Sequence, residues 1–97
     1  MINHISHGLR FMHVVKFSQD QGVFALAREE ATRKVHLFLI LGNEEKIYRR
    51  DGRNNRWRLL EREHLFPVLT SISNAVDGGL AVLNVNGRTD SVINLNN

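Results

Sequence analysis

The apolar run VHLFLIL at residues 35–41 is the feature that most constrains the fold of this chain. It is followed at once by the turn-forming residues GNEE, and it is far shorter than the roughly 20 apolar residues that a membrane-crossing helix needs. A short apolar run bounded by turn signals is typical of a strand that is buried on both faces. The sequence therefore predicts a sheet in which residues 35–41 form a central strand.

Length and composition fit one globular domain. The chain has 97 residues, of which 42% are apolar and 24% are charged, and these are ordinary proportions for a protein that buries one modest core. We therefore expect a single domain over residues 1–97, with fraying confined to the polar ends at 1–8 and 95–97.

Missing residues and motifs argue against several kinds of chemistry. The chain has no cysteine, which excludes disulfides and thiolate ligands. It contains no G-x-S-x-G and no G-x-x-x-x-G-K-[ST] sequence. His4, His7 and His13 have no carboxylate close by in the sequence. We expect no catalysis, no metal and no other cofactor; because no secretory signal or membrane-length run is visible, we expect a cytoplasmic protein without a membrane partner.

Alternation and turn residues predict most of the strands. Residues 9–17 alternate between two faces with the period of a strand. KIYRR at 46–50 and RWRLL at 56–60 flank the turn sequence DGRNN. Together with the central apolar run, these segments predict a three-stranded meander over about residues 35–60.

Residues 18–34 are consistent with two structures. Ser18 and Gln21 have the spacing of a capping box, and four apolar residues between 24 and 35 recur at helical intervals. These features favour a helix over residues 23–34. Gly22 weakens the case for this helix. In the competing interpretation, VFALAR pairs with KVHLFLIL as a hairpin around EEAT.

Two further elements are predicted toward the C-terminus. The apolar residues between 65 and 76 recur every three or four positions, which predicts a helix over residues 64–77 with Pro67 in its first turn. Thr70 and Ser71 lower the helical propensity, so a strand is the alternative. The pair Asn86-Gly87 lies between two β-prone runs and predicts a type I′ hairpin.

These elements predict an α+β fold: an antiparallel β-sheet, made of the meander and the C-terminal hairpin, with one or two helices packed on one face. An all-β fold is the alternative. IYRRDG and NRW resemble tectonin or Kelch repeats, and this resemblance implies propeller-blade-like repeats whose edges would pair between subunits.

Positive charge is concentrated in residues 46–62. This segment carries seven basic and two acidic side chains, whereas the rest of the chain carries six basic and eight acidic ones. A charge distribution this uneven indicates an anionic partner for one region of the surface rather than for all of it.

The Arg-rich hairpin in this segment is the candidate site. If Ile47, Trp57 and Leu59 face the core, strand alternation places the neighbouring cations and Tyr48 on the wet face, while Arg49 points inward. Guanidinium groups present paired donors to phosphate, and a tyrosine ring can stack on an unpaired base. The candidate nucleic-acid-binding residues are Lys46, Tyr48, Arg49, Arg50, Arg53, Arg56 and Arg58.

We therefore expect a small non-catalytic binding protein that contacts a polyanion, with nucleic acid as the favoured partner. The alternative is a protein-interaction, adaptor or inhibitor module that binds an acidic protein surface or forms homo-oligomers through its sheet edges. A plain solvated face is a third interpretation, because exposed strand positions often carry arginine.

Overall fold

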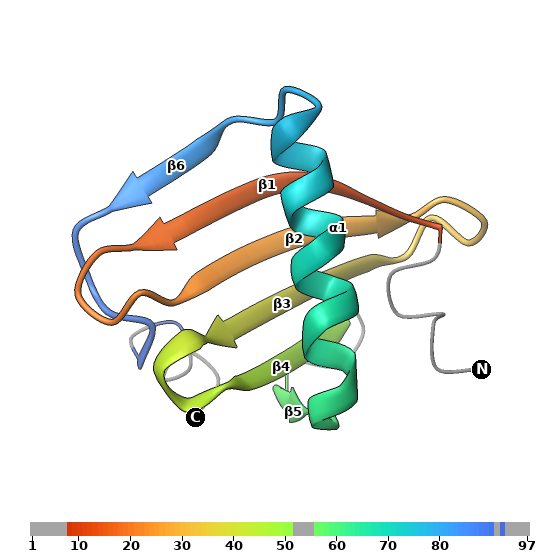
Figure 1. Ribbon diagram of the computed structural model, residues 1–97. Helices are drawn as coiled ribbons and strands as arrows, with labels where there is room; N and C mark the ends of the chain where they lie inside the picture. The colour runs from red at the N-terminus through yellow and green to blue at the C-terminus, as the bar shows by residue number, and fades with distance from the viewer. Residues whose placement is uncertain (1–7, 52–55, 91, 93–97) are drawn as a thin grey trace.

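The protein has an α+β fold, in which a six-stranded mixed sheet is crossed on one face by helix α1 (Figure 1). The computed structural model describes residues 8–51, 56–90 and 92. Its strands are β1 (Leu9–Phe17), β2 (Val23–Glu29), β3 (Val35–Leu41), β4 (Lys46–Asp51), β5 (Arg58–Leu59) and β6 (Val82–Val85), and α1 spans Leu65–Asp77. Short 3₁₀ turns at Gly42–Glu44 and Arg62–His64 precede β4 and α1. Several predictions are confirmed: the strand over 9–17, the interior strand over 35–41 with its meander, and the C-terminal helix.

The sheet has the order β5-β4-β3-β2-β1-β6. The first five strands form an antiparallel meander, whereas β6 pairs with β1 in parallel. The prediction of a wholly antiparallel sheet is therefore wrong, and α1 is the reason. A helix of 13 residues is about 20 Å long, roughly four strand spacings. It carries the chain from the β5 edge across the sheet to the β1 edge. Leu80, which follows the helix, lies beside Arg10 and Phe11 at the start of β1, so β6 runs in the same direction as β1.

Residues 23–34 do not form the predicted helix; β2 and the turn after it take their place, as in the competing hairpin interpretation. Ala25 and Ala27 are fully buried on the side of α1, where their small side chains let the helix approach the sheet. Phe24 and Leu26 lie on the other side. Because β2 is apolar on both faces, its residues also matched a helical interval, and the good helix formers in it were overridden by the tertiary structure.

The predicted hairpin at Asn86-Gly87 is also wrong in the described part of the chain, where residues 88–90 and 92 form no strand. The chain turns instead onto the β1–β2 turn. The Ser18 N–H donates to the Val85 carbonyl at 3.0 Å, and the Gln19 N–H donates to the Gly87 carbonyl at 3.1 Å. These bonds attach the segment after β6 to the turn at residues 18–22.

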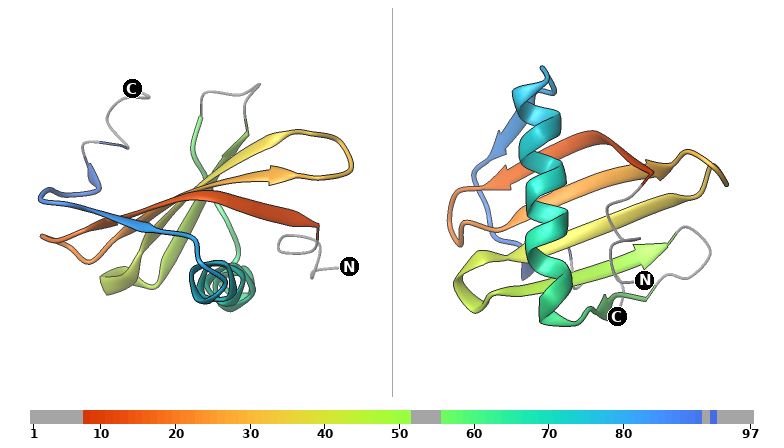
Figure 2. Two further views of the ribbon diagram at one scale, coloured as in Figure 1. Left: turned by 90° about the horizontal axis from the view of Figure 1, so that it is seen from above. Right: turned by 45° about the vertical axis from the view of Figure 1, so that its right-hand side comes forward.

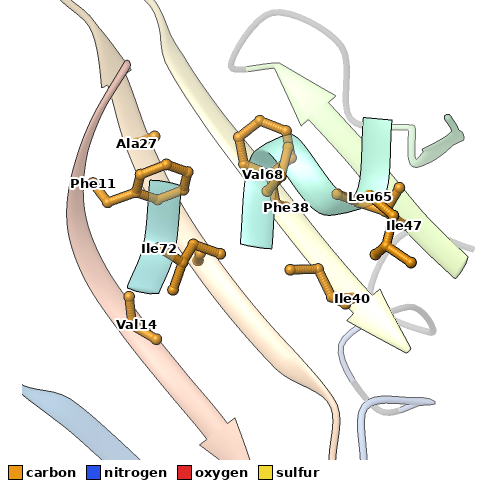
Figure 3. Close-up of a cluster of buried hydrophobic side chains, with 10 residues drawn as sticks. Phe11, Val14, Ala27, Phe38, Ile40, Ile47, Leu65, Val68 and Ile72 are labelled. Atoms are coloured by element: carbon orange, nitrogen blue, oxygen red, sulfur yellow. The ribbon is translucent and has the colours of Figure 1, made fainter. Parts of the chain in front are cut away.

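The core lies between α1 and one face of the sheet (Figures 2 and 3). Leu65, Val68 and Ile72 project from α1 at helical spacing and are buried. They pack against Phe11 and Val14 of β1, Ala25 and Ala27 of β2, Phe38 and Ile40 of β3, and Ile47 of β4. Each large side chain buried in this way stabilises the fold by about 1.5–3 kcal/mol.

Helix α1 ends at two glycines. Gly79 takes a φ of +114°, which glycine adopts without steric cost. The N–H groups of Gly79 and Leu80 then donate to the carbonyls of Val76 and Ala75, both at 3.0 Å, which closes the helix with a Schellman motif. One helix against one sheet also rules out the all-β, propeller-blade-like alternative. Within the described ranges, no helix is long and apolar enough to cross a membrane.

Candidate functional site

The face of the sheet opposite α1, here called the open face, carries a continuous row of apolar and aromatic side chains. Residues that stand directly opposite each other in neighbouring strands share a face. The strand register therefore aligns one residue from each strand across the whole sheet: Leu83, Val15, Phe24, Leu39, Tyr48 and Leu59. Antiparallel sheets that face water normally carry polar residues there, so an apolar row across the whole open face is unusual.

The row is covered in its middle and exposed at its ends. Leu39 at the centre is fully buried, whereas Leu59 is 55% exposed and Leu83 is 63% exposed. Phe24, Tyr48 and Val15 are half-buried. The accessible apolar surface of the row is therefore concentrated at the two outer strands of the sheet.

Trp57 lies over this row, next to Phe24. The two rings meet edge to face with their centroids 6.4 Å apart. The Arg50 guanidinium lies 5.9 Å from the centre of the Trp57 ring, which is a cation–π distance. The Trp57 Nε1 is buried and has no hydrogen-bond partner among the residues that the structure describes. Trp57 was expected to face the core with Ile47; it lies on the opposite side of the sheet.

Every charged residue that the strands place on the open face is basic. Strand register assigns Arg10, Arg28, Lys46 and Arg50 to it. Glu29 of β2 lies on the other face, where its carboxylate contacts the His36 Nε2 at 3.0 Å. Lys46 is partly neutralised, since its amine lies 3.5 Å from the Glu44 carboxylate, but exposed pairs of this kind are weak.

The predicted site residues are divided between the two faces. Lys46, Tyr48 and Arg50 share the open face, as predicted. Arg49 stands opposite Arg58 on the face that α1 covers, so the expectation that Arg58 lies beside Tyr48 is wrong. The physical reason is the register of β4 with β5, which places Leu59 opposite Tyr48 and so exposes a residue that was expected in the core. Arg56 is exposed just before β5, and Arg53 lies outside the described residues.

The aromatic and basic residues of the open-face strands that the predicted site lacked are Phe24, Arg10 and Arg28. Phe24 and Arg28 belong to the segment that was predicted to be a helix, where alternation has no meaning. Arg10 lies in a strand that was predicted, but its cross-strand partner Arg28 was not. The period of two in VFALARE was the signal that could have placed Phe24 and Arg28 on one face, and the pairing of β1 with β2 then adds Arg10.

The other polar clusters lie away from the open-face row. The hydrogen bond from His36 lowers the pKa of Glu29, and the neighbouring Glu61 carboxylate raises the pKa of Glu63. Across residues 8–51, 56–90 and 92, no group of three His, Asp or Glu side chains is arranged to hold a metal ion. These clusters therefore offer no competing site.

No protein-family model matches this chain, and comparisons with curated proteins and with solved structures find no significant match.

Proposed function

We propose that this protein is a non-catalytic binding protein that holds single-stranded nucleic acid on the open face of its sheet. One observation carries the proposal: the open face combines a row of apolar and aromatic side chains with strand charges that are all basic. A single-stranded nucleic acid has the complementary chemistry, because its bases are flat and apolar on their faces and its backbone is anionic.

The aromatic residues supply the contacts with bases. Stacking of a base on an aromatic side chain is worth about 1–3 kcal/mol and tolerates any base. Tyr48 is partly accessible on the row, and Trp57 lies beside it with Arg50 against its ring. A sheet that presents rings in this way suits unpaired bases, whereas the bases of a duplex are stacked on each other and unavailable.

The basic residues supply the contacts with phosphates. Four cations on the face, at about 0.7 counterions released per phosphate contact, predict a log–log salt slope of about −3 for a single strand. Readout of a particular base sequence is not part of the proposal, since stacking and charge neutralisation do not distinguish sequences.

A matched pair of charge variants tests the proposal. Arg50→Gln removes one positive charge from the open face, and Arg58→Gln removes one from the opposite face. Fluorescence anisotropy with a labelled oligothymidine, at two salt concentrations, should show binding weakened about tenfold by Arg50→Gln and less than twofold by Arg58→Gln. Equal effects of the two variants, or binding that is insensitive to salt, would contradict the proposal.

A protein-interaction module is the second candidate function, and the exposed ends of the row favour it. Leu59 and Leu83 leave apolar surface on both outer strands of the sheet, where a second copy of the chain or another protein could pack. In addition, β6 pairs with β1 only from Val14 onward, which leaves the first residues of β1 at an edge. This function requires a stable oligomer at micromolar concentration or a complex with an acidic protein. Size-exclusion chromatography with light scattering measures the mass of either species and so tests it.

A further inference from the structure

Three arginines line a cleft at the end of the sheet where β1 begins and β2 ends. The cleft has a volume of about 460 Å³. Its lining consists of Arg10, Phe11, Met12, Arg28, Glu30, Arg33 and Leu80. Arg28 lies two same-face positions along β2 from Phe24, which is about 13 Å at the rise of a strand. The cleft is therefore separate from the aromatic part of the row.

Two of these arginines are direct cross-strand neighbours. Arg10 of β1 stands opposite Arg28 of β2, so two like charges share one position of the ladder. Like charges placed directly opposite each other destabilise a sheet. Among the described residues, neither arginine makes an ion pair that would offset this repulsion. Glu30 lines the same cleft but forms no ion pair with either of them.

The third arginine is held in place by an unusual backbone. Arg33 has a φ of +63°, a conformation that residues with a side chain rarely adopt. Its N–H donates to the Glu29 carbonyl at 2.8 Å, and the Glu29 N–H donates to the Lys34 carbonyl at 2.8 Å. These bonds fix the β2–β3 turn, so Arg33 is directed by a tight turn rather than by a loose loop. The repulsion between Arg10 and Arg28 costs stability, and an anion in the cleft would offset that cost.

We propose that this cleft is a phosphate-binding site. Guanidinium groups match the oxygens of a phosphate with paired, charge-assisted hydrogen bonds. Three guanidinium groups and one carboxylate give the cleft a net charge of +2, which a dianionic phosphate neutralises. Phe11, Met12 and Leu80 also line the cleft and supply apolar surface that suits the organic part of a phosphorylated compound. Arg10 and Arg28 also belong to the four cations of the proposed nucleic-acid surface, so inorganic phosphate, which has no bases to stack, is the probe that tests the cleft separately.

Titration with inorganic phosphate tests the site directly. With uniformly ¹⁵N-labelled protein, phosphate should produce saturable shifts in the amide resonances of residues 10–12, 28–33 and 80, whereas sodium chloride at matched ionic strength should not. Arg28→Gln should weaken phosphate binding at least tenfold. Arg58→Gln loses the same charge at the far edge of the sheet and should weaken it less than twofold. Absence of saturable shifts, or equal effects of both variants, would overturn the proposal.

Thermal unfolding gives a second readout with opposite signs. In low salt without phosphate, Arg28→Gln should raise the Tm by about 2–4 °C, because it removes the cross-strand repulsion. In millimolar phosphate, the Tm of the natural protein should rise and that of Arg28→Gln should not. If Arg28→Gln does not fold, Arg10→Gln makes the same test from the other strand.

A Tm that phosphate raises equally in the natural protein and in the variant would also refute the site. Binding of phosphate without binding of oligothymidine would leave this site intact and remove the proposed function.

Discussion

The two faces of the sheet differ in how their apolar residues are covered. Under α1, the buried side chains of four strands meet Leu65, Val68 and Ile72, and the charged residues lie at the margin. On the open face, a row of apolar and aromatic side chains crosses all six strands, and α1 lies on the other side of the sheet. The apolar residues under α1 form the core that a stable fold requires, whereas those of the open face are additional to that core. Under the proposed function, the partly accessible apolar residues of the open face are the surface that a partner would contact.

The largest expected difference between the faces is in stability. Phe38→Ala empties a buried position under α1 and should lower the free energy of unfolding by about 3–5 kcal/mol. Phe24→Ala removes the same ring from the half-buried open face, so a smaller loss of about 1–2 kcal/mol is expected. Urea unfolding of both variants measures the difference. Equal losses would mean that the open face is a second core and not a contact surface.

Strand β6 contributes Leu83 to the open face and is attached to the β1–β2 turn through the segment that follows it. The Asp20 carboxylate accepts hydrogen bonds from the Thr89 N–H at 2.7 Å, from the Thr89 hydroxyl and from the Gly22 N–H at 3.0 Å. Burial alone would raise the pKa of Asp20, but these hydrogen bonds and the charge of Arg88 outweigh it, so the pKa of Asp20 lies below its ordinary value. The unfolded chain therefore binds this proton more tightly than the native chain.

Asp20→Asn should accordingly cost about 1–2 kcal/mol at pH 7. The contribution of the carboxylate is fully present above about pH 4 to 5 and is lost as the pH falls through the native pKa, because protonation removes the charged acceptor. The difference in unfolding free energy between the natural protein and Asp20→Asn should shrink on acidification. Asp77→Asn, at the exposed end of α1, is the control and should change stability little. A difference that does not vary with pH would refute this account of the attachment.

Two charge variants of Leu83 distinguish the two candidate functions. They should also have the smallest effect on stability. Leu83 is largely exposed, so Leu83→Lys and Leu83→Glu should each change stability by no more than about 0.5 kcal/mol. If the open face binds nucleic acid, the lysine variant should bind oligothymidine about twofold more tightly and the glutamate variant should bind it more weakly. If the row is a dimer interface, both charges should weaken self-association. Anisotropy and light scattering on the same two variants decide between these results.

The sequence was informative where one signal was unambiguous. Alternation at residues 9–17 and the apolar run at 35–41 specified their strands, and the spacing of apolar residues specified α1. It was misleading where contacts with residues distant in the sequence determine the secondary structure. The β2 segment is apolar on both faces, so its periodicity fitted a helix as well as a strand, and only the approach of α1 to Ala25 and Ala27 explains why small residues lie there.

The candidate site was predictable only in part, for the same reason. Lys46, Tyr48 and Arg50 belong to one strand, so alternation within that strand was enough to group them. Arg58 and Leu59 depend on the register between β4 and β5, which the turn sequence alone does not specify. The pairing of Arg10 with Arg28 required the β1–β2 ladder, and the parallel position of β6 required the path of α1 across the sheet.

The most direct test of the central claim uses the chain's only tryptophan, because Trp57 lies on the open face. Its emission should be followed while unlabelled oligothymidine is added at low salt. We expect saturable quenching that reverses when salt is raised, since bases would stack beside the ring while phosphates contact the surrounding cations. Emission that stays unchanged at oligonucleotide concentrations well above micromolar would contradict it.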